Sequence, residues 1–344
     1  MSQPMAVDLF CGAGGLTCGM RQAGIKVVAG IDADKKMKDI YEKNNPGSKF
    51  ILDDIRNVTG EQINQLFAIS GDSKILAGCA PCKPFSTMNR KGGSKHTDYT
   101  LLDSFSRLIL EIKPDGVIME NVPGITKKGG KIFSNFLESL EKVGLQYAFT
   151  ESLDAADYGV PQHRKRLILI AAREKPSFPK KSHGPRTERP YKTVNDVIGK
   201  IKPISAGYRE YNLRNHSCKA LSETNLLRLR KTPHDGGSRK DIPVELWIPS
   251  HRDHSGHSDT YGRMAWNKPS PTLTCSCLSV SNGRYAHPEQ DRGISIREAA
   301  MLQTFPKRYS LPSTFEDAQR AIGNAFPPLL ARKFSRALLR SLDP

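Results

Sequence analysis

The chain has 344 residues, enough for two domains or for one large domain with an insertion, and either would bury an apolar core without disulfides. No run of about 18 apolar residues is present and MSQPMAVDLF lacks the features of a secretory signal, which excludes a membrane-spanning or secreted protein and favours the cytoplasm, or the nucleus in a eukaryote. Lys and Arg number 52 against 35 Asp and Glu, a formal net charge of +17, and this excess favours a polyanionic partner such as nucleic acid.

Short apolar runs alternate with amphipathic stretches from the N-terminus. AVDLF, KVVAGIDAD and KILAGCAPC predict strands, with helices between them in LTCGMRQAG and KKMKDIYEKN. LLDSFSRLILEIKP then predicts a helix, DGVIMENV a buried strand, IFSNFLESLEKVG a helix capped near Gly144, and RLILIAA a further strand. This alternation is typical of an α/β fold with a mostly parallel, doubly wound sheet covered on both faces.

The pattern changes near Glu174, where prolines and polar residues replace the repeating unit. A helix is predicted in SIREAAMLQTF and an amphipathic helix in FPPLLARKFSRALLRSL, after paired prolines. We expect a first domain over residues 1–178, a smaller irregular domain over 179–317, and a C-terminal helix over 318–344 that returns to the first domain.

A glycine-rich turn, DLFCGAGGLTCG, follows the first predicted strand. Its glycines would let the backbone pass close to a ligand and present amide groups at a helix N-terminus, although the spacing is not G-x-G-x-x-G. Asp32 ends the second predicted strand, and Asp54 with Ile55 ends a candidate third. Together these residues indicate a nucleoside pocket at the carboxyl edge of a parallel sheet. Each aspartate alone is more often a helix cap or a loop charge.

Five motifs occur in order along the chain: FCGAGGL (10–16), PCKPFS (81–86), ENV (120–122), QHRKR (162–166) and GNAFPP (323–328). In this order they resemble the DNA cytosine-5 methyltransferases, over nearly the whole chain and most weakly from about 178 to 290, where that family keeps its variable target-recognition domain. The resemblance implies a Rossmann-like S-adenosylmethionine-dependent methyltransferase domain. It also implies methyl transfer to carbon 5 of a cytosine flipped out of a specific double-stranded DNA sequence, with S-adenosyl-L-homocysteine as product.

Carbon 5 of cytosine is a poor nucleophile, and a thiolate that adds at carbon 6 activates it by forming an enamine. Cys82 stands where the family carries this nucleophile, and Glu120 resembles the family's residue that hydrogen bonds to ring nitrogen 3. By the same resemblance Arg164 would hold the cytosine carbonyl oxygen, with Gln162 and Arg166 supporting the loop. The alternative interpretation of these arginines is an exposed basic cluster.

The resemblance also implies which residues bind the cofactor. They are Phe10, Gly12, Gly14, Leu16, Asp32, Ala33, Asp54, Ile55, Pro81, Leu101 and Asn324. Ala33 offers little area where family members place a side chain against the adenine, so we expect Ile55 and Phe10 to hold the ring. Ala80 and Lys83 depart from the family's usual proline and glutamine, and Lys83 would favour the Cys82 thiolate or contact a phosphate.

The two cysteines of GCAPCKPFS permit a redox pair, half of a metal site, or a single nucleophile. A redox pair should open a helix, whereas the proline-rich sequence here predicts a long loop. Zinc would need two more ligands at matched spacing. His251, His254, His257, Cys275 and Cys277 are the candidates, but only one residue separates the two cysteines and HRDHSGHSD predicts a polar loop. We therefore predict no metal, Cys82 acting alone, and Cys79 as a small core residue ending the strand.

The target cytosine must leave the duplex, and a basic loop after Cys82 could close over it. Its expected DNA contacts are Lys83, Ser86, Arg90 and Lys91, although an ordinary surface loop is the alternative. Sequence recognition should fall to residues from about 179 to 295, and by resemblance Thr272, Leu273 and Thr274 approach the flipped base.

Two other functions are consistent with these motifs. An RNA cytosine-5 methyltransferase would share the fold and the chemistry, but the long variable segment favours duplex DNA. A catalytically inert DNA-binding relative would share the pocket, but the presence of Cys82, Glu120 and Arg164 weighs against it. We expect a monomer that acts on double-stranded DNA, with a cognate restriction endonuclease system as a candidate partner.

Overall fold

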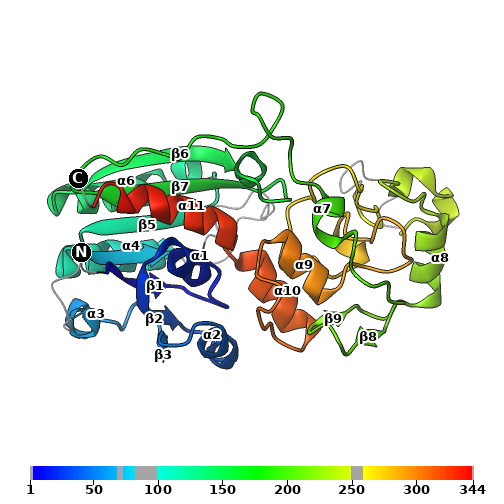
Figure 1. Cartoon of the computed structure of the whole chain (residues 1–344), viewed down its shortest axis with the longest axis horizontal. Coiled ribbons are helices and arrows are strands. Elements are labelled where there is room, and N and C mark those ends of the chain that lie inside the picture. Colours follow the sequence, from blue (N-terminus) through cyan, green and yellow to red (C-terminus); the bar gives the residue numbers. More distant parts are fainter. Residues whose placement is uncertain (1–2, 68–72, 82–98, 249–258, 343–344) are drawn as a thin grey trace. The chain divides into compact units, whose positions relative to one another are not determined.

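A computed structural model describes residues 3–67, 73–81, 99–248 and 259–342, and these form two compact units (Figure 1). Unit 1 comprises the described residues of 1–154, 165–180 and 326–344, and unit 2 those of 155–164 and 181–325. The expected boundary at 178 lies two residues from the end of the second segment of unit 1. Residues 155–164 and 318–325 belong to unit 2.

Unit 1 is built on a sheet that has seven strands within the described residues, in the order β3-β2-β1-β4-β5-β7-β6. The strands are β1 (Met5–Leu9), β2 (Lys26–Asp32), β3 (Lys49–Leu52), β4 (Lys74–Gly78), β5 (Gly116–Asn121), β6 (Gln146–Asp154) and β7 (Lys165–Ala172). The pairs among β1 to β5 are parallel, and β7 runs antiparallel to β5 and β6. The prediction of a mostly parallel α/β sheet is confirmed.

Helices cover both faces of this sheet. They are α1 (Gly15–Ala23), α2 (Lys38–Asn44), α3 (Gly60–Phe67), α4 (Tyr99–Ile112), α5 (Ile125–Lys128), α6 (Gly130–Lys142) and α11 (Pro328–Leu339). Figure 1 shows α1 and α11 together on one face, with α4 on the other. Gly19 permits the α1–α11 contact, because a Cβ there would lie 2.3 Å from the Ala331 Cβ. On the opposite face of the sheet, the Phe105 ring of α4 packs edge-on against the Phe136 ring of α6, with the ring centroids 5.3 Å apart.

Unit 2 contains little regular structure. Its described elements are α7 (Val194–Ile198), β8 (Arg209–Glu210), β9 (His216–Ser217), α8 (Glu223–Lys231), α9 (Ile296–Leu302), α10 (Phe315–Asn324) and short 3₁₀ turns. Irregular backbone leaves carbonyl groups without ladder partners, and each buried one needs a donor. No helix in the described ranges of the chain is long and apolar enough to cross a membrane.

Buried arginines supply many of those donors. Arg164, Arg263, Arg292 and Arg297 are among the largest fully buried side chains. Arg263, for example, donates to the carbonyls of Thr232, His287, Gln290 and Leu229 at 2.8–3.1 Å and pairs with Asp291. These guanidinium groups hold unit 2 together from inside, so they do not contribute to its surface charge.

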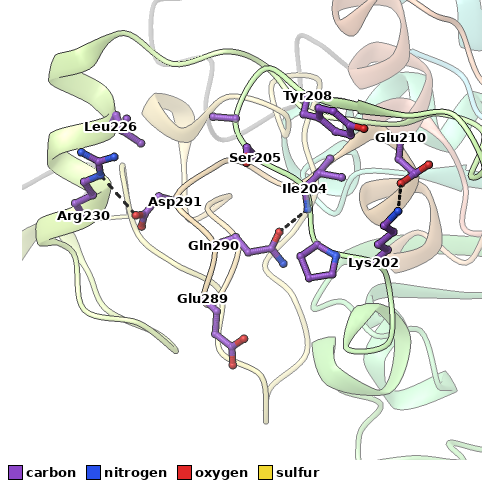
Figure 2. Close-up of a pocket in the computed structure, with 12 residues that line it drawn as sticks. Lys202, Ile204, Ser205, Tyr208, Glu210, Leu226, Arg230, Glu289, Gln290 and Asp291 are labelled. Atoms are coloured by element: carbon purple, nitrogen blue, oxygen red, sulfur yellow. Dashed lines mark hydrogen bonds and ion pairs between the residues drawn. The ribbon is translucent and has the colours of Figure 1, made fainter.

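A hollow of about 740 Å³ lies in unit 2 between residues 202–210, α8 and residues 289–291 (Figure 2). Lys202 pairs with Glu210 at 2.9 Å, and Arg230 lies 3.9 Å from Asp291. Gln290 accepts a hydrogen bond from the Ile204 N–H at 3.1 Å. Four of the charged groups of its wall therefore lie in pairs, and Glu289 accepts a hydrogen bond from Trp266 outside it.

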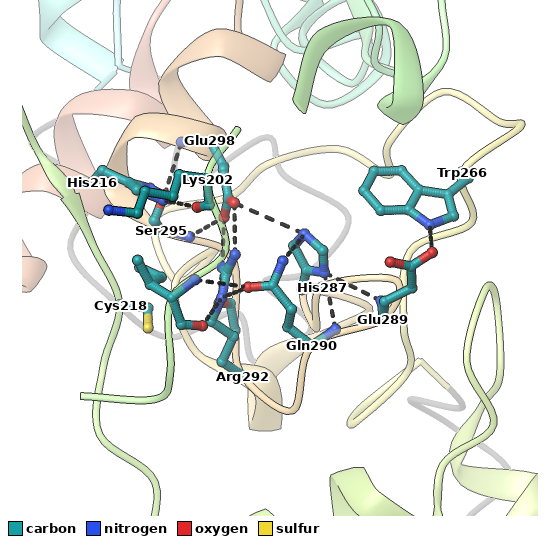
Figure 3. A network of polar contacts seen from close by, with 12 residues as sticks. Lys202, His216, Cys218, Trp266, His287, Glu289, Gln290, Arg292, Ser295 and Glu298 are labelled. Carbon is teal, nitrogen blue, oxygen red and sulfur yellow. Dashed lines mark hydrogen bonds and ion pairs between the residues drawn. The ribbon is translucent and has the colours of Figure 1, made fainter. Parts of the chain in front are cut away.

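A second feature of unit 2 is the buried ion pair between Arg292 and Glu298 (Figure 3). Both terminal nitrogens of Arg292 donate to the carboxylate at 2.7 Å, and Glu298 also accepts from the Ser295 N–H to cap α9. Burial alone would raise the pKa of Glu298, but the hydrogen bonds and charge of Arg292 hold it at about 2. Burial lowers the pKa of neighbouring His287 to about 3, although the charge of Glu298 opposes this. His287 is therefore neutral in the folded protein near neutral pH.

Candidate active site

The glycine-rich turn lies between β1 and α1 and uses left-handed backbone. Gly12 and Gly14 have φ of 50° and 85°, and Phe10 has φ of 59°, which a side chain adopts only at a cost. A Cβ at Gly12 would meet nothing within 4 Å, so open space lies beside the turn. The turn therefore fits a ligand that approaches the backbone closely.

Two carboxylates lie at the same edge of the sheet, because β1, β2 and β3 are parallel neighbours. Asp32, at the end of β2, accepts hydrogen bonds from the Gly12 N–H and the Asp34 N–H, both at 2.8 Å. Asp54, two residues beyond β3, pairs with Arg56 through both oxygens. The hydrogen bonds from Arg56 lower the pKa of Asp54. Asp32 thus fixes the glycine turn, and Asp54 is ionised near neutral pH.

The other residues expected at this site are either buried in the core or exposed. Leu16 and Ile55 are buried, and Phe10 and Leu101 are half-buried against the core cluster that includes Ile55. Ala33 and Pro81 are exposed in unit 1, and Asn324 is exposed at the end of α10 in unit 2. The structure therefore gathers Phe10, Ile55 and Leu101 within one packed region.

Asp8 is a fully buried carboxyl in β1, beneath the glycine turn. Its Oδ2 accepts from the Thr17 hydroxyl at 2.6 Å and from the Thr17 N–H at 3.0 Å. Its Oδ1 has no hydrogen-bond partner among the described residues. Burial raises the pKa of Asp8 to about 7; the Thr17 hydrogen bonds lower it and the charge of Asp32 raises it further. No sequence pattern marks this carboxyl group beyond its place in DLF.

Asp8→Asn is expected to change how stability depends on pH. The pKa of Asp8 in the folded protein lies above its ordinary value of 3.8, so ionisation of Asp8 lowers the free energy of unfolding as pH rises from about 4 to 7. The total loss is up to about 4 kcal/mol, and it is constant above that pH range. The free energy of unfolding of the asparagine variant, minus that of the wild type, should therefore increase between pH 5 and 7 and stay constant above pH 7. Urea denaturation at pH 5, 6, 7 and 8 measures this, and a difference that does not vary with pH would contradict it.

Glu120 and Arg166 form the central pair of the candidate site. Glu120 lies near the end of β5, opposite Ile168 of β7. Arg166 is two residues from Ile168, so its side chain lies on the same face of the sheet as Glu120. Arg166 Nε lies 2.8 Å from Glu120 Oε1, and the Glu120 side chain is 8% exposed. Glu120 Oε1 has no hydrogen-bond partner among the described residues.

Arg164 has different surroundings, in unit 2. It is 2% exposed, and its terminal nitrogens donate to the carbonyls of Leu273 and Gly323 at 3.1 and 3.0 Å. A Cβ at Gly323 would lie 2.3 Å from the Thr274 backbone, so only glycine fits there. The guanidinium of Arg164 is thus committed to backbone, which differs from the expected contact with cytosine.

The segment 161–164 is paired with the segment 270–273 within unit 2. The His163 and Ser270 N–H groups each donate across the pair at 2.9 Å, and Gln162 Oε1 accepts from the Leu273 N–H at 3.0 Å. The Thr272 hydroxyl donates to the His163 carbonyl at 2.6 Å. Leu273 is fully buried, and the expectation that Thr272, Leu273 and Thr274 approach the flipped base stays a prediction. Gln303, bonded to Gln162, was not predicted because no sequence pattern links positions so far apart.

Several predicted site residues lie outside the described residues. These are Cys82, Lys83, Ser86, Arg90 and Lys91, together with the alternative metal ligands His251, His254 and His257.

The other cysteines are described. Cys79 follows the end of β4 and is half-buried, so its prediction as a core residue is wrong. Burial raises the pKa of Cys277 to about 12, and the exposed Cys275 donates to Asn324 Oδ1 at 2.8 Å. Within the described ranges, no group of three or more His, Cys, Asp or Glu residues could hold a metal ion.

Comparison with known proteins places these features in context. The family model described as C-5 cytosine-specific DNA methylase matches residues 5–340. The type II methylase M.HgiDII of Herpetosiphon aurantiacus is 42% identical over 98% of this chain and 95% of its own length. The type II methyltransferase M.PspPI of a Psychrobacter species is 32% identical over 98% of this chain and 79% of its own.

Solved structures show the same fold at lower identity. A prophage-encoded protein of Escherichia coli, described as a DNA modification methyltransferase, aligns with a TM-score of 0.76 and 22% identity over 99% of this chain and 100% of its own. A DNMT2 variant of Spodoptera frugiperda aligns with a TM-score of 0.65 and 17% identity over 99% of this chain and 100% of its own.

Proposed function

The chain belongs to the C-5 cytosine-specific DNA methylase family and is a DNA (cytosine-5-)-methyltransferase, and from this premise we propose how its residues perform the reaction. The observation that carries the proposal is the Glu120–Arg166 pair, a buried carboxyl group beside a guanidinium at the end of β5. Such a pair can hydrogen bond to two adjacent positions on the edge of a cytosine ring.

The cofactor of the proposal is S-adenosylmethionine, which supplies an electrophilic methyl group when bound. The residues present fit it, because the turn at Gly12 leaves open space and the edge of the sheet offers two carboxylates. Phe10 and Ile55 would pack against the adenine, and Asp32 and Asp54 would accept hydrogen bonds from the nucleoside. The other expected cofactor contacts remain part of this proposal.

For the chemical step, we assign the nucleophile to Cys82. Its thiolate forms a bond to carbon 6, and the electrons of the 5,6 double bond make carbon 5 nucleophilic. The Glu120 carboxyl group hydrogen bonds to nitrogen 3 and stabilises the charge that develops on the ring. Carbon 5 gains the methyl group and S-adenosyl-L-homocysteine is released. Solvent water then takes the carbon 5 proton, and the electrons of that C–H bond re-form the 5,6 double bond and expel the thiolate.

The cytosine carbonyl oxygen is assigned to Arg166 in place of Arg164. Arg166 lies beside Glu120, whereas Arg164 holds the carbonyls of Leu273 and Gly323. Arg164 and Gln162 are therefore positioning residues that keep segments 161–164 and 270–273 together.

Arg166→Ala is expected to lower kcat about 10²- to 10³-fold, because it removes a donor at the reacting ring. Arg164→Ala should lower Tm by several degrees, because it leaves two buried carbonyls unsatisfied. Single-turnover methyl transfer and thermal unfolding of both variants measure these effects. The assignment is wrong if Arg164→Ala is stable and inactive while Arg166→Ala keeps its rate.

We propose duplex DNA of a specific sequence as the substrate, since the similar relatives carry type II methyltransferase names. A cognate restriction endonuclease, a monomeric state and a bacterial cytoplasmic location complete the proposal. Incubation with tritiated donor and either duplex DNA or RNA tests the substrate, and bisulfite sequencing of plasmid from expressing cells maps the site. Label in RNA alone, or in neither, would refute it.

A further inference from the structure

Arg107 and Glu111 form an ion pair one helical turn apart on α4, and both side chains also bind other segments of unit 1. Arg107 Nη1 donates to the two carboxylate oxygens of Glu111 at 2.9 and 3.1 Å. The side chains are 36% and 37% exposed, and an ion pair so accessible to water contributes little to stability by itself. The hydrogen bonds that the pair makes outside α4 are therefore the more informative ones.

Arg107 holds the turn that follows β3, residues 53–58, here called the Asp54 turn. Arg107 Nη2 donates to the Val58 carbonyl at 2.8 Å and to the Ile55 carbonyl at 3.2 Å. The Ile55 and Val58 side chains are buried, so the two residues whose carbonyls are held also anchor the turn in the core. One guanidinium thus fixes two points of the backbone that carries Asp54.

Glu111 holds the start of the next helix, α3. Glu111 Oε2 accepts a hydrogen bond from the N–H of Gly60, the first residue of α3, at 2.6 Å. A Cβ at Gly60 would lie 2.4 Å from the Glu111 Cβ, so this approach requires glycine. The pair therefore connects the Asp54 turn and α3 to α4, and α3 and α4 are neighbours in unit 1 (Figure 1).

Other hydrogen bonds shape the Asp54 turn from within. The Asn57 N–H donates to the Asp54 carbonyl at 2.8 Å, and the Asp54 N–H donates to Asp53 Oδ1 at 2.7 Å. The Asp53 N–H donates to the Asp32 carbonyl at 3.3 Å, which connects the turn to the end of β2. These bonds set the local conformation, whereas the bonds from Arg107 attach the turn to α4.

The proposed cofactor contacts depend on the position of this turn. Ile55 would pack against the adenine and Asp54 would accept a hydrogen bond from the nucleoside. Leu101, another expected contact, lies on α4 six residues before Arg107. Arg107 thus fixes the turn to the helix that carries Leu101. A site that is ordered before its ligand arrives binds more tightly, because less conformational freedom is lost on binding.

We propose that Arg107 is a positioning residue for the cofactor, which acts through the Ile55 and Val58 carbonyls to keep the Asp54 turn in its binding conformation. Its effect is on the affinity for S-adenosylmethionine and not on the methyl-transfer step. This inference rests on the proposed cofactor site. It adds a residue that lies outside all five sequence motifs.

Arg107→Ala, Arg107→Lys and the matched control Lys142→Ala test the proposal. Lys142 of α6 also has an acidic partner one turn away, with Glu138 at 4.0 Å. Isothermal titration of S-adenosyl-L-homocysteine without DNA should give a Kd raised about 10-fold or more in Arg107→Ala. The KM for S-adenosylmethionine should rise by a similar factor, with kcat at saturating cofactor within about 2-fold of the wild type. Arg107→Lys should recover part of the affinity, because an ammonium group donates to carbonyls but lacks the planar fork. The control should bind as the wild type does.

Hydrogen exchange of the unliganded protein gives a readout that needs no cofactor. The Arg56 and Asn57 N–H groups donate to Asp54 within the Asp54 turn, at 3.0 and 2.8 Å. Both should exchange faster in Arg107→Ala than in the wild type, because a turn released from α4 opens more often. Their exchange rates should not change in Lys142→Ala.

Two results would overturn the assignment. One is an Arg107→Ala protein with wild-type Kd and KM, and the other is a fall in kcat at an unchanged KM. Should Arg107→Ala fail to fold, an Arg107→Lys protein with wild-type affinity would overturn it as well. A wild type that binds S-adenosyl-L-homocysteine but labels no DNA would instead refute the proposed substrate, so the two failures are distinguishable.

Discussion

Cys82→Ser is expected to lose methyl transfer by about 10³-fold or more, while Cys79→Ser keeps most of its activity. A serine hydroxyl is far less nucleophilic than a thiolate near neutral pH, so addition at carbon 6 fails. Cys79 is half-buried directly after β4 and has no role in the proposed chemistry. Single-turnover transfer to the mapped duplex measures both variants.

A covalent trap gives an independent readout of the same prediction. Duplex DNA containing 5-fluorocytosine should form a stable adduct, because the fluorine at carbon 5 cannot leave as a proton does. Peptide mapping should locate the adduct at residue 82. Similar activity losses in the two serine variants, or an adduct that persists in Cys82→Ser, would refute the single-nucleophile assignment.

Arg292→Leu is expected to destabilise unit 2 by about 3–5 kcal/mol, because it leaves the buried Glu298 carboxylate without its partner. The double variant Arg292→Leu, Glu298→Leu should recover much of this loss, since an apolar pair of similar volume avoids the desolvation cost. Urea denaturation followed by fluorescence measures each value.

The exposed pair Lys142–Glu138 provides the control for this experiment. Its side chains are more than half exposed and lie 4.0 Å apart, so Lys142→Ala should cost no more than about 1 kcal/mol. If Arg292→Leu costs as little as this control, or if the double variant is less stable than the single one, the ion pair does not act as described.

The sequence predicts unit 1 well because its signals are local. Alternating apolar runs and amphipathic stretches indicated the parallel strands β1, β2, β4 and β5 and the helices between them. The edge strand β6 was not predicted, because most of its residues are exposed or half-exposed and no apolar alternation marks it. Its position depends on pairing with β7, which is a tertiary property.

Unit 2 shows the limit of composition as evidence. Its arginines contribute to the net charge that favours nucleic acid, yet Arg263, Arg292 and Arg297 are buried and bind backbone carbonyls. A count of cations cannot distinguish a surface charge from one that satisfies irregular backbone. The buried role becomes visible only once the carbonyls that need donors are known.

The candidate site, too, could be predicted from the sequence only in part. Motif order identified Glu120 and the QHRKR segment, but not which arginine lies beside the carboxyl group. That choice depends on strand register: Arg166 lies in β7 on the face of Glu120, whereas Arg164 precedes the strand, which begins at Lys165. Register is set by packing of the whole sheet, so the motif alone could not decide it.

The placement of residues 155–164 in unit 2, although β6 and β7 of unit 1 flank them, limits how this enzyme could be recombined with its relatives. A chimera that exchanges only 181–325 would separate Gln162 and Arg164 from the backbone groups they hold, and its recipient would have to offer matching carbonyls. A chimera should therefore keep the sequence specificity of its donor best when residues 155–164 are exchanged together with residues 181–325.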